Sequence, residues 1–465
     1  MTRGLITLYG GVLIAAGGIF LLIRAYGETL APGAPALLGP VVGASPGREV
    51  LPHILFALAA VVLLGRVLSR ILKPLGQPPV IGEVLAGILL GPSLLGPELS
   101  ARILPPEAAP ALGVVAQLGV ILFMFLIGLE LDLGFLRRRA RTTVAISHAG
   151  IVVPFLLGAV LALGLYPRLA TEGVPFTTFA LFLGVAMAMT AFPILARILT
   201  DQALERTPLG ILALGVAAVG DVTAWCLLAL VVGLARAEVG SGLLIAGGAL
   251  AFIAVMVAVA RPLLERLSRR GPEHLSEGAV AAVFVALFAS ALVADRIGIH
   301  AIFGAFLLGA VIPHDGPVAR FFERRMRVTV TVFLLPAFFA HTGMRTRIDL
   351  VSGAEAWAIC GVIILLATLG KLGGVYVAGR AAGIRRRQAG ALGALMNARG
   401  LMELIVLNIG LELGVISPTL FSMMVLMAIV TTMSATPALW IFLGDRERRG
   451  RLDLEPAIPL DSATS

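Results

Sequence analysis

Long apolar stretches alternate along the chain with short polar segments. Most of these stretches are about 20 residues long, which is the length that an α-helix needs to cross the hydrocarbon layer of a membrane. The pattern predicts an all-α polytopic membrane protein. It predicts about fourteen transmembrane helices, near residues 5–24, 51–72, 78–96, 111–133, 143–166, 176–199, 209–235, 240–268, 277–296, 298–313, 328–346, 355–380, 388–411 and 417–443.

Two of these helices are interrupted in mid-span. The sixth contains Pro193, and the thirteenth contains Gly400 beside several polar residues. When residues 51–235 and 277–443 are taken as two six-helix repeats joined by the helix 240–268, each interrupted helix is the fifth of its repeat. The repeats are an odd number of helices apart, so the second is inverted relative to the first. Such paired interruptions favour a transporter whose binding site lies near the middle of the membrane.

The composition agrees with a membrane protein and excludes a soluble one. Hydrophobic residues make up 58% of the chain and charged residues 14%, with a mean hydropathy of +1.00, whereas soluble domains carry about a quarter charged residues. A net charge of +9 would suggest nucleic-acid binding in a soluble protein. Here the basic residues form short clusters between apolar stretches, so we expect membrane lipids and no nucleic acid as partners.

The basic residues are distributed unevenly between the two sides of the predicted helix bundle. With the N-terminus in the cytoplasm, 26 of the 36 lysines and arginines fall in inner segments and 8 in outer segments. Lys and Arg accumulate on the cytoplasmic side of membrane proteins, so we predict a protein of the cell membrane with both termini in the cytoplasm. Residues 1–50 then form a first helix and a loop, residues 51–443 the transmembrane domain, and residues 444–465 a short cytoplasmic tail.

Charged residues also occur inside the predicted helices. Asp221 lies half-way along the seventh helix, where an ionised carboxylate costs at least ~2.5–3.5 kcal/mol, and Lys371 is equally deep in the twelfth. Both are therefore candidate functional groups. Arg399 and Glu403 are four residues apart, so they either neutralise each other or contact the transported ion, and the spacing leaves both readings open. Asn397 belongs to the same polar cluster.

Sites of other kinds are not indicated. The sequence has no Gly-x-x-x-x-Gly-Lys-Ser/Thr phosphate loop, its six histidines are widely separated, and Cys226 and Cys360 both lie in apolar stretches. We therefore expect no enzyme active site, no cofactor and no metal site other than one for a monovalent cation. A gated cation channel and a transporter-like sensor that does not transport remain as alternatives.

Several long motifs carry a family resemblance that runs from about Leu51 to Trp440. By their number, order and spacing, the chain resembles the monovalent cation:proton antiporter-2 family, and especially its plant-type cation/proton exchanger branch. The motifs are Gln77–Glu83 (QPPVIGE), Gly87–Ser93 (GILLGPS), Phe125–Asp132 (FLIGLELD), Thr190–Pro193 (TAFP), Leu195–Leu199 (LARIL), Gly298–His300 (GIH), Phe303–Phe306 (FGAF), Met396–Leu401 (MNARGL) and Glu403–Asn408 (ELIVLN).

The resemblance implies the sodium/proton antiporter fold, with one extra helix at the N-terminus. In that fold the two broken helices cross near the membrane centre, a six-helix core slides against a panel, and the protein is a homodimer. By position, Asp221 would bind K+ or Na+ and a proton in turn, with Thr190 and Ala191 beside it. Lys371 matches a basic residue that relatives carry in the helix before the second break.

One departure from the family pattern lies next to Asp221. Relatives commonly carry Asp-Asp or Asn-Asp in this helix, whereas the pair here is Gly220-Asp221. Because Lys371 lacks an acidic partner at position 220, we expect its ammonium group to pair with Asp221 instead. With one carboxylate, one proton replaces one cation, so exchange is expected to move no net charge.

Overall fold

The computed structural model describes residues 2–30, 50–103, 105, 108–130, 140–204, 207–236, 242–269, 275–313 and 316–443. These residues form helices joined by short turns, and the one isolated β-bridge among them pairs Ala170 with Ile416. The all-α prediction is confirmed. The predicted loop before residue 50 and the predicted tail 444–465 lie outside the described residues.

Every predicted transmembrane segment contains a helix, although the bounds differ by a few residues. The longer helices are α1 (Thr2–Gly27), α2 (Val50–Leu72), α3 (Pro79–Leu90), α6 (Ala109–Glu130), α8 (Ala140–Leu169), α9 (Phe176–Ala188), α10 (Phe192–Asp201), α11 (Pro208–Arg236), α12 (Gly242–Val255), α13 (Arg261–Arg269), α14 (Glu277–Ile297), α15 (Ala301–Val311), α16 (Pro317–Thr329), α17 (Leu335–Arg345), α18 (Gly353–Ala381), α19 (Arg386–Met396), α20 (Leu401–Glu412) and α21 (Pro418–Phe442). Short helical turns are α4 (Pro92–Leu95), α5 (Pro97–Ile103), η1 (Lys73–Leu75) and η5 (Ile348–Leu350), and two π-helical turns, η3 (Met256–Ala260) and η4 (Val330–Leu334), join α12 to α13 and α16 to α17.

Within the described residues, ten helices are long and apolar enough to cross a membrane by themselves. Three shorter apolar helices lie at Leu13–Gly27, Pro79–Leu90 and Ala301–Val311. Helices α19 and α20, the two halves of the second interrupted helix, have 11 and 12 residues, so neither is long enough to be counted as a membrane-spanning helix. The chain is therefore a multi-pass helical protein, but helix length does not establish the predicted number of fourteen crossings.

The eleventh predicted helix begins earlier than the sequence pattern suggested. Its first part, α16, starts at Pro317 and carries four arginines among thirteen residues. Val318, Ala319 and Phe322 are buried on one side of α16, while the arginines are exposed. A helix with one apolar and one charged face has a low mean hydropathy, so a search for continuous apolar stretches misses it.

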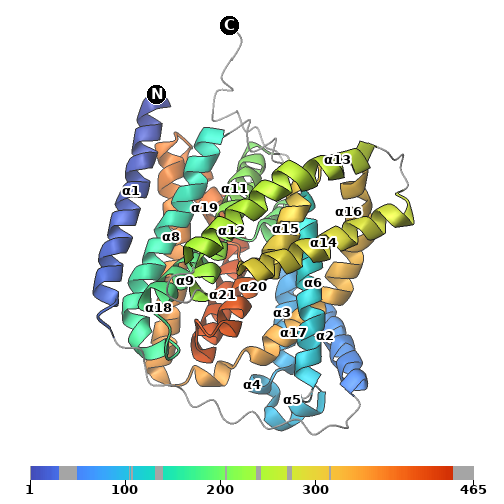
Figure 1. Ribbon diagram of the computed structural model, residues 1–465. Helices are drawn as coiled ribbons and strands as arrows, with labels where there is room; N and C mark the ends of the chain where they lie inside the picture. The colour runs from blue at the N-terminus through green and yellow to red at the C-terminus, as the bar shows by residue number, and fades with distance from the viewer. Residues whose placement is uncertain are drawn as a thin grey trace.

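The helices pack into two groups (Figure 1). In the first, which we call the core bundle, α8 packs against α9, α11 and α18, and α21 packs against α18, α19 and α20. In the second, the panel bundle, α6 packs against α15 and α17, α3 against α2 and α17, and α14 against α15. The extra helix α1 lies along α8 and α9, on the outside of the core bundle.

Candidate ion-binding site

Both interrupted helices are broken inside the core bundle, and the two breaks cross. Helix α9 ends at Ala188 and α10 begins at Phe192, while α19 ends at Met396 and α20 begins at Leu401. The backbone N–H of Ala191 donates a hydrogen bond of 3.0 Å to the carbonyl oxygen of Ala398. Each break thus satisfies part of the other's backbone, as it must where no water or lipid group can do so.

Pro193 and Gly400 account for the breaks locally. Pro193 lies in the first turn of α10, where proline's missing N–H is tolerated because it would have no helical partner. Gly400 has φ +128° and ψ −121°, a conformation that residues with a side chain rarely adopt. A Cβ atom at this position would also lie 2.3 Å from Cδ1 of Ile194. The sequence motif therefore dictates the chain path.

Asp221 projects from α11 into the protein interior beside the first break. Its relative exposure is 4%, and neither carboxylate oxygen has a hydrogen-bond partner among the described residues. The backbone amide of Phe192, at the start of α10, and the ammonium group of Lys371 both act electrostatically on the carboxylate. A buried carboxylate without partners is costly. A proton or a cation on such a carboxylate would lower that cost.

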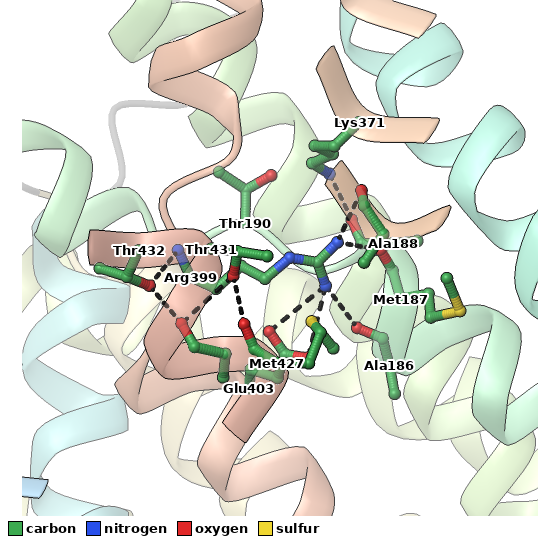
Figure 2. Close-up of polar contacts among 12 residues, drawn as sticks. Ala186, Met187, Ala188, Thr190, Lys371, Arg399, Glu403, Met427, Thr431 and Thr432 are labelled. Atoms are coloured by element: carbon green, nitrogen blue, oxygen red, sulfur yellow. Dashed lines mark hydrogen bonds and ion pairs between the residues drawn. The ribbon is translucent and has the colours of Figure 1, made fainter. Parts of the chain in front are cut away.

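Arg399 ties the broken helices together (Figure 2). Its side chain is completely buried, and its guanidinium group donates hydrogen bonds to the carbonyl oxygens of Ala186 at 3.2 Å, Met187 at 2.7 Å and Ala367 at 3.4 Å. Ala186 and Met187 belong to the last turn of α9, where carbonyl groups lack the usual helical partners, although that of Ala186 also accepts the N–H of Met189 at 3.4 Å. A positive charge at a helix C-terminus is also favoured by the helix dipole.

Glu403 forms an ion pair with Arg399. Both carboxylate oxygens lie 3.3 Å from one guanidinium nitrogen, and both side chains are almost completely inaccessible. Of the two readings that the four-residue spacing left open, the structure shows the mutual neutralisation. Because a buried pair is stable only while both partners are present, each residue depends on the other.

Lys371 does not pair with Asp221, and in this conformation the expected pairing is wrong. Its ammonium group donates hydrogen bonds to the carbonyl oxygen of Gly150 at 2.9 Å and to that of Ala188. Ala188 is the last residue of α9, so the break itself supplies the acceptor. Lys371 and Arg399 therefore both place a positive charge at the C-terminus of α9, which is the negative end of its helix dipole (Figure 2).

Thr190 and Asn397 lie at the crossing but are bound only weakly. The hydroxyl of Thr190 is 3.5 Å from the carbonyl oxygen of Met396. The amide nitrogen of Asn397 is 3.4 Å from the hydroxyl of Ser434 and 3.5 Å from the carbonyl oxygen of Thr431, while its Oδ1 atom has no partner among the described residues. Both side chains are buried and make only long hydrogen bonds at the crossing.

Gly220 faces α8. A Cβ atom at this position would lie 3.2 Å from Oγ of Ser147, which itself donates a hydrogen bond of 2.8 Å to the carbonyl oxygen of Val216. A side chain at position 220 would therefore crowd Ser147. The missing carboxylate is not replaced by another acidic group bonded to Lys371, whose described hydrogen-bond partners are both carbonyl oxygens.

Two cavities between the core and panel bundles were not anticipated from the sequence. The first, which we call the inner cavity, has a volume of about 360 Å³, and Ala191 and Pro193 at the first break form part of its wall. The second, the outer cavity, has a volume of about 300 Å³ and is lined by Asn408 and Glu412 of α20 together with residues of the panel bundle. Cavities arise from gaps between packed helices, which no local sequence pattern encodes.

The charge of Lys371 is expected to weaken cation binding at Asp221. Lys371→Gln keeps two N–H donors for the carbonyl oxygens of Gly150 and Ala188 but removes the charge. Because a cation at Asp221 would then be repelled less, we expect the apparent cation affinity to rise by about 1 kcal/mol, roughly fivefold. The measurement is the apparent KM for the cation at several pH values, with Lys73→Gln at an exposed position as the control. An unchanged KM and pH profile would show that the lysine's charge does not act on Asp221.

Comparison with known proteins gives consistent results. The family model of the sodium/hydrogen exchanger transmembrane region matches residues 56–442. The Na+/H+ antiporter NhaS4 of Synechocystis is 41% identical over 83% of this chain and 95% of its own length. Cation/H+ antiporter 17 of Arabidopsis thaliana is 38% identical over 86% of this chain, which spans about half (49%) of that relative's length. The solved structure of the sodium proton antiporter MjNhaP1 from Methanocaldococcus jannaschii has the same fold, with a TM-score of 0.60 at 16% identity, covering 84% of this chain and all of that one.

Proposed function

The chain belongs to the sodium/hydrogen exchanger family of transmembrane proteins, and from that premise we propose that it is a secondary antiporter that exchanges a monovalent cation, K+ or Na+, for protons. The observation that carries the proposal is the buried carboxylate of Asp221, which has no hydrogen-bond partner among the described residues and lies beside the crossed breaks. Such a group takes up either a proton or a monovalent cation, but not both at once.

Exchange follows from the energetics of the empty site. An ionised carboxylate that moves through the low-dielectric interface between the two bundles meets a desolvation penalty of several kcal/mol. When a proton or a cation neutralises Asp221, that penalty falls and the core bundle can move against the panel bundle. The site therefore changes sides readily only when it is loaded, which couples the movement of the two ions.

The inner cavity gives access to the first break from one side. Ala191 and Pro193 form part of its wall together with Arg66 and Arg197, whereas no residue of either break lines the outer cavity. By the distribution of basic residues, the side of the inner cavity is the cytoplasmic side. On the opposite side α17 and α20 are held together, since Arg345 contacts Glu412 at 3.1 Å and Asn408 donates a hydrogen bond of 2.9 Å to Thr342.

The other residues of the site have separate roles in this proposal. Thr190 and Asn397 offer oxygen atoms close to the bound ion, in addition to the backbone at Ala191. Lys371 and Arg399 compensate the helix ends and set the local charge, with Glu403 as the partner of Arg399. We further propose that the protein lies in the cell membrane as a homodimer in contact with lipid, with both termini in the cytoplasm, and that it acts without cofactor or enzymatic step.

The proposal is tested with the purified protein in liposomes that contain a pH-sensitive dye. An outward proton gradient is imposed, and then KCl, NaCl or choline chloride is added. Antiport predicts that K+ or Na+ changes the internal pH and that choline does not. A cation current without obligatory proton movement would identify a channel, and no response to any salt would identify a protein that does not transport. Either of these results would overturn the proposal.

The same liposomes also test the charge balance. With one carboxylate, one proton replaces one cation, and the transport cycle moves no net charge as long as Lys371 keeps its proton. A membrane voltage acts on moving charge with about 2.3 kcal/mol per elementary charge per 100 mV. We therefore expect the initial exchange rate to be the same with and without a voltage imposed by an ion that the protein does not carry.

A further inference from the structure

The inner cavity has an unusual distribution of charge for a path that a cation follows. Three charged residues line it, Arg66 and Arg197 together with Glu83 of α3. Arg197 forms an ion pair of 3.0 Å with Asp201, outside the lining of the cavity. Glu83 forms neither a hydrogen bond nor an ion pair with any of the described residues, and the nearby positive charge that acts on it is that of Arg66. Glu83 is the one acidic group among the described residues that line this cavity.

The packing of α2 against α3 determines where Glu83 lies. Gly65 of α2 faces it so closely that a Cβ atom at position 65 would lie 3.2 Å from Cγ of Glu83 and 3.3 Å from its Cα. Gly82 is even closer to α2, because a Cβ atom there would lie 2.5 Å from the backbone nitrogen of Ser69. The two glycines let the helices approach, and the side chain of Glu83 forms part of the cavity wall.

From this geometry we propose that Glu83 is a transient cation-binding residue of the inner cavity, where a monovalent cation from the cytoplasmic side is held before it reaches Asp221. The inference rests on the proposed antiport function and adds the residue that determines cation access from one side. It differs from the carrier site in two respects. Glu83 belongs to the panel bundle, whereas Asp221 belongs to the core bundle. The side chain of Glu83 lines the cavity, whereas Asp221 lies beside the crossed helix ends.

A cation-binding residue is needed in the inner cavity because the two arginines in its wall carry the same charge as the cation. Arg66 and Arg197 repel an incoming cation, and in a narrow cavity with apolar walls such repulsion is screened less than in bulk water. Val80, Phe123 and Phe339 are among the apolar groups of that wall. A carboxylate in the same cavity wall lowers this barrier and raises the local cation concentration, which is how charged clefts increase the rate of ion capture.

Glu83→Gln removes the charge and keeps the size of the side chain. We expect the apparent KM for cytoplasmic cation to rise about five- to tenfold, with a maximal rate within about twofold of wild type. The KM for external cation should not change, because Glu83 lines the inner cavity and not the outer one. Glu83→Asp, which keeps the charge, should recover most of the affinity, and Glu277→Gln at an exposed position of α14 is the matched control.

The measurement uses liposomes in which the protein has a single orientation, with K+ or Na+ varied on one side at a time. A wild-type KM on the cytoplasmic side in Glu83→Gln overturns the inference, and so does an equal rise on both sides. Complete loss of exchange at saturating cation would place Glu83 in the carrier site and also overturn it. If Glu83→Gln unfolds, Glu83→Asp and Glu83→Ser are compared by the same two-sided assay. Failure of the proposed function itself is recognised separately, because the wild-type protein would then show no exchange at all.

Discussion

Asp221→Asn is expected to abolish cation/proton exchange while the protein still folds. Asparagine has nearly the same shape as aspartate but carries no charge and releases no proton, so it can neither bind a cation electrostatically nor exchange it for a proton. In wild type the carboxylate oxygens have no partners among the described residues. No side-chain hydrogen bond among the described residues is therefore lost in the variant, and asparagine keeps an oxygen for the backbone amide of Phe192, so we expect the site to lose its chemistry without losing its structure.

The measurement is the initial rate of pH change in liposomes at saturating K+ or Na+, where we expect a decrease of at least about a hundredfold. Asp349→Asn is the control, because Asp349 is an exposed residue of η5 paired with Arg347 and lies away from the breaks. Cation binding gives a second readout. Salt should raise the thermal stability of wild type but not of Asp221→Asn. Exchange at a near wild-type rate in the purified variant would refute the assignment of Asp221.

Arg399→Ala is expected to have the largest effect on stability. The side chain is completely inaccessible and connects α9, α18 and α20 through three carbonyl oxygens and the carboxylate of Glu403. Its removal leaves the charge of Glu403 buried without its partner and leaves carbonyl groups at the end of α9 unsatisfied. Breaking a buried ion pair by removing one partner costs about 3–5 kcal/mol. We expect a much lower unfolding temperature in detergent and little protein in the membrane.

Two further variants separate this explanation from a general sensitivity of the fold. Arg399→Met combined with Glu403→Met removes both charges together, so it should be more stable than Arg399→Ala. Arg168→Ala breaks an exposed pair with Glu355 and should change stability by no more than about 1 kcal/mol. All variants are compared at one heating rate, because membrane proteins often unfold irreversibly. A wild-type unfolding temperature for Arg399→Ala would show that the α9 end does not need this cation.

The sequence was sufficient to predict the helical class, the approximate position of each helix and the two breaks. Apolar stretches of membrane-spanning length have few alternatives to a helix, because the backbone must satisfy its own hydrogen bonds in lipid. Pro193 and Gly400 mark the breaks for local reasons, namely a missing N–H group and a backbone conformation that favours glycine. The amphipathic start at Pro317 was missed because charged and apolar residues average out along α16.

The sequence alone also predicted a carboxylate inside the helix bundle at Asp221, and the structure confirms that this side chain is buried, since a carboxylate in the middle of an apolar helix has no local partner to explain it. The partners of the buried cations could not be found in this way. Lys371 was expected to bind Asp221, but the structure gives it the carbonyl oxygens of Gly150 and Ala188. Backbone carbonyl groups are the same in every residue, so no sequence pattern shows which of them a distant helix end will leave unpaired.

What the sequence by itself determined is therefore what depends on neighbours along the chain: the helices, their interruptions and the misplaced charges. The tertiary structure alone decided which groups meet across helices. It brought the side chains of Arg399 and Lys371 to the carbonyl oxygens at the end of α9. It also left the oxygens of Asp221 without a hydrogen-bond partner among the described residues, and it formed a cavity whose wall includes both Glu83 and Ala191. These features depend on how two bundles pack against each other, and packing joins residues that are hundreds of positions apart, whose contacts no local pattern records.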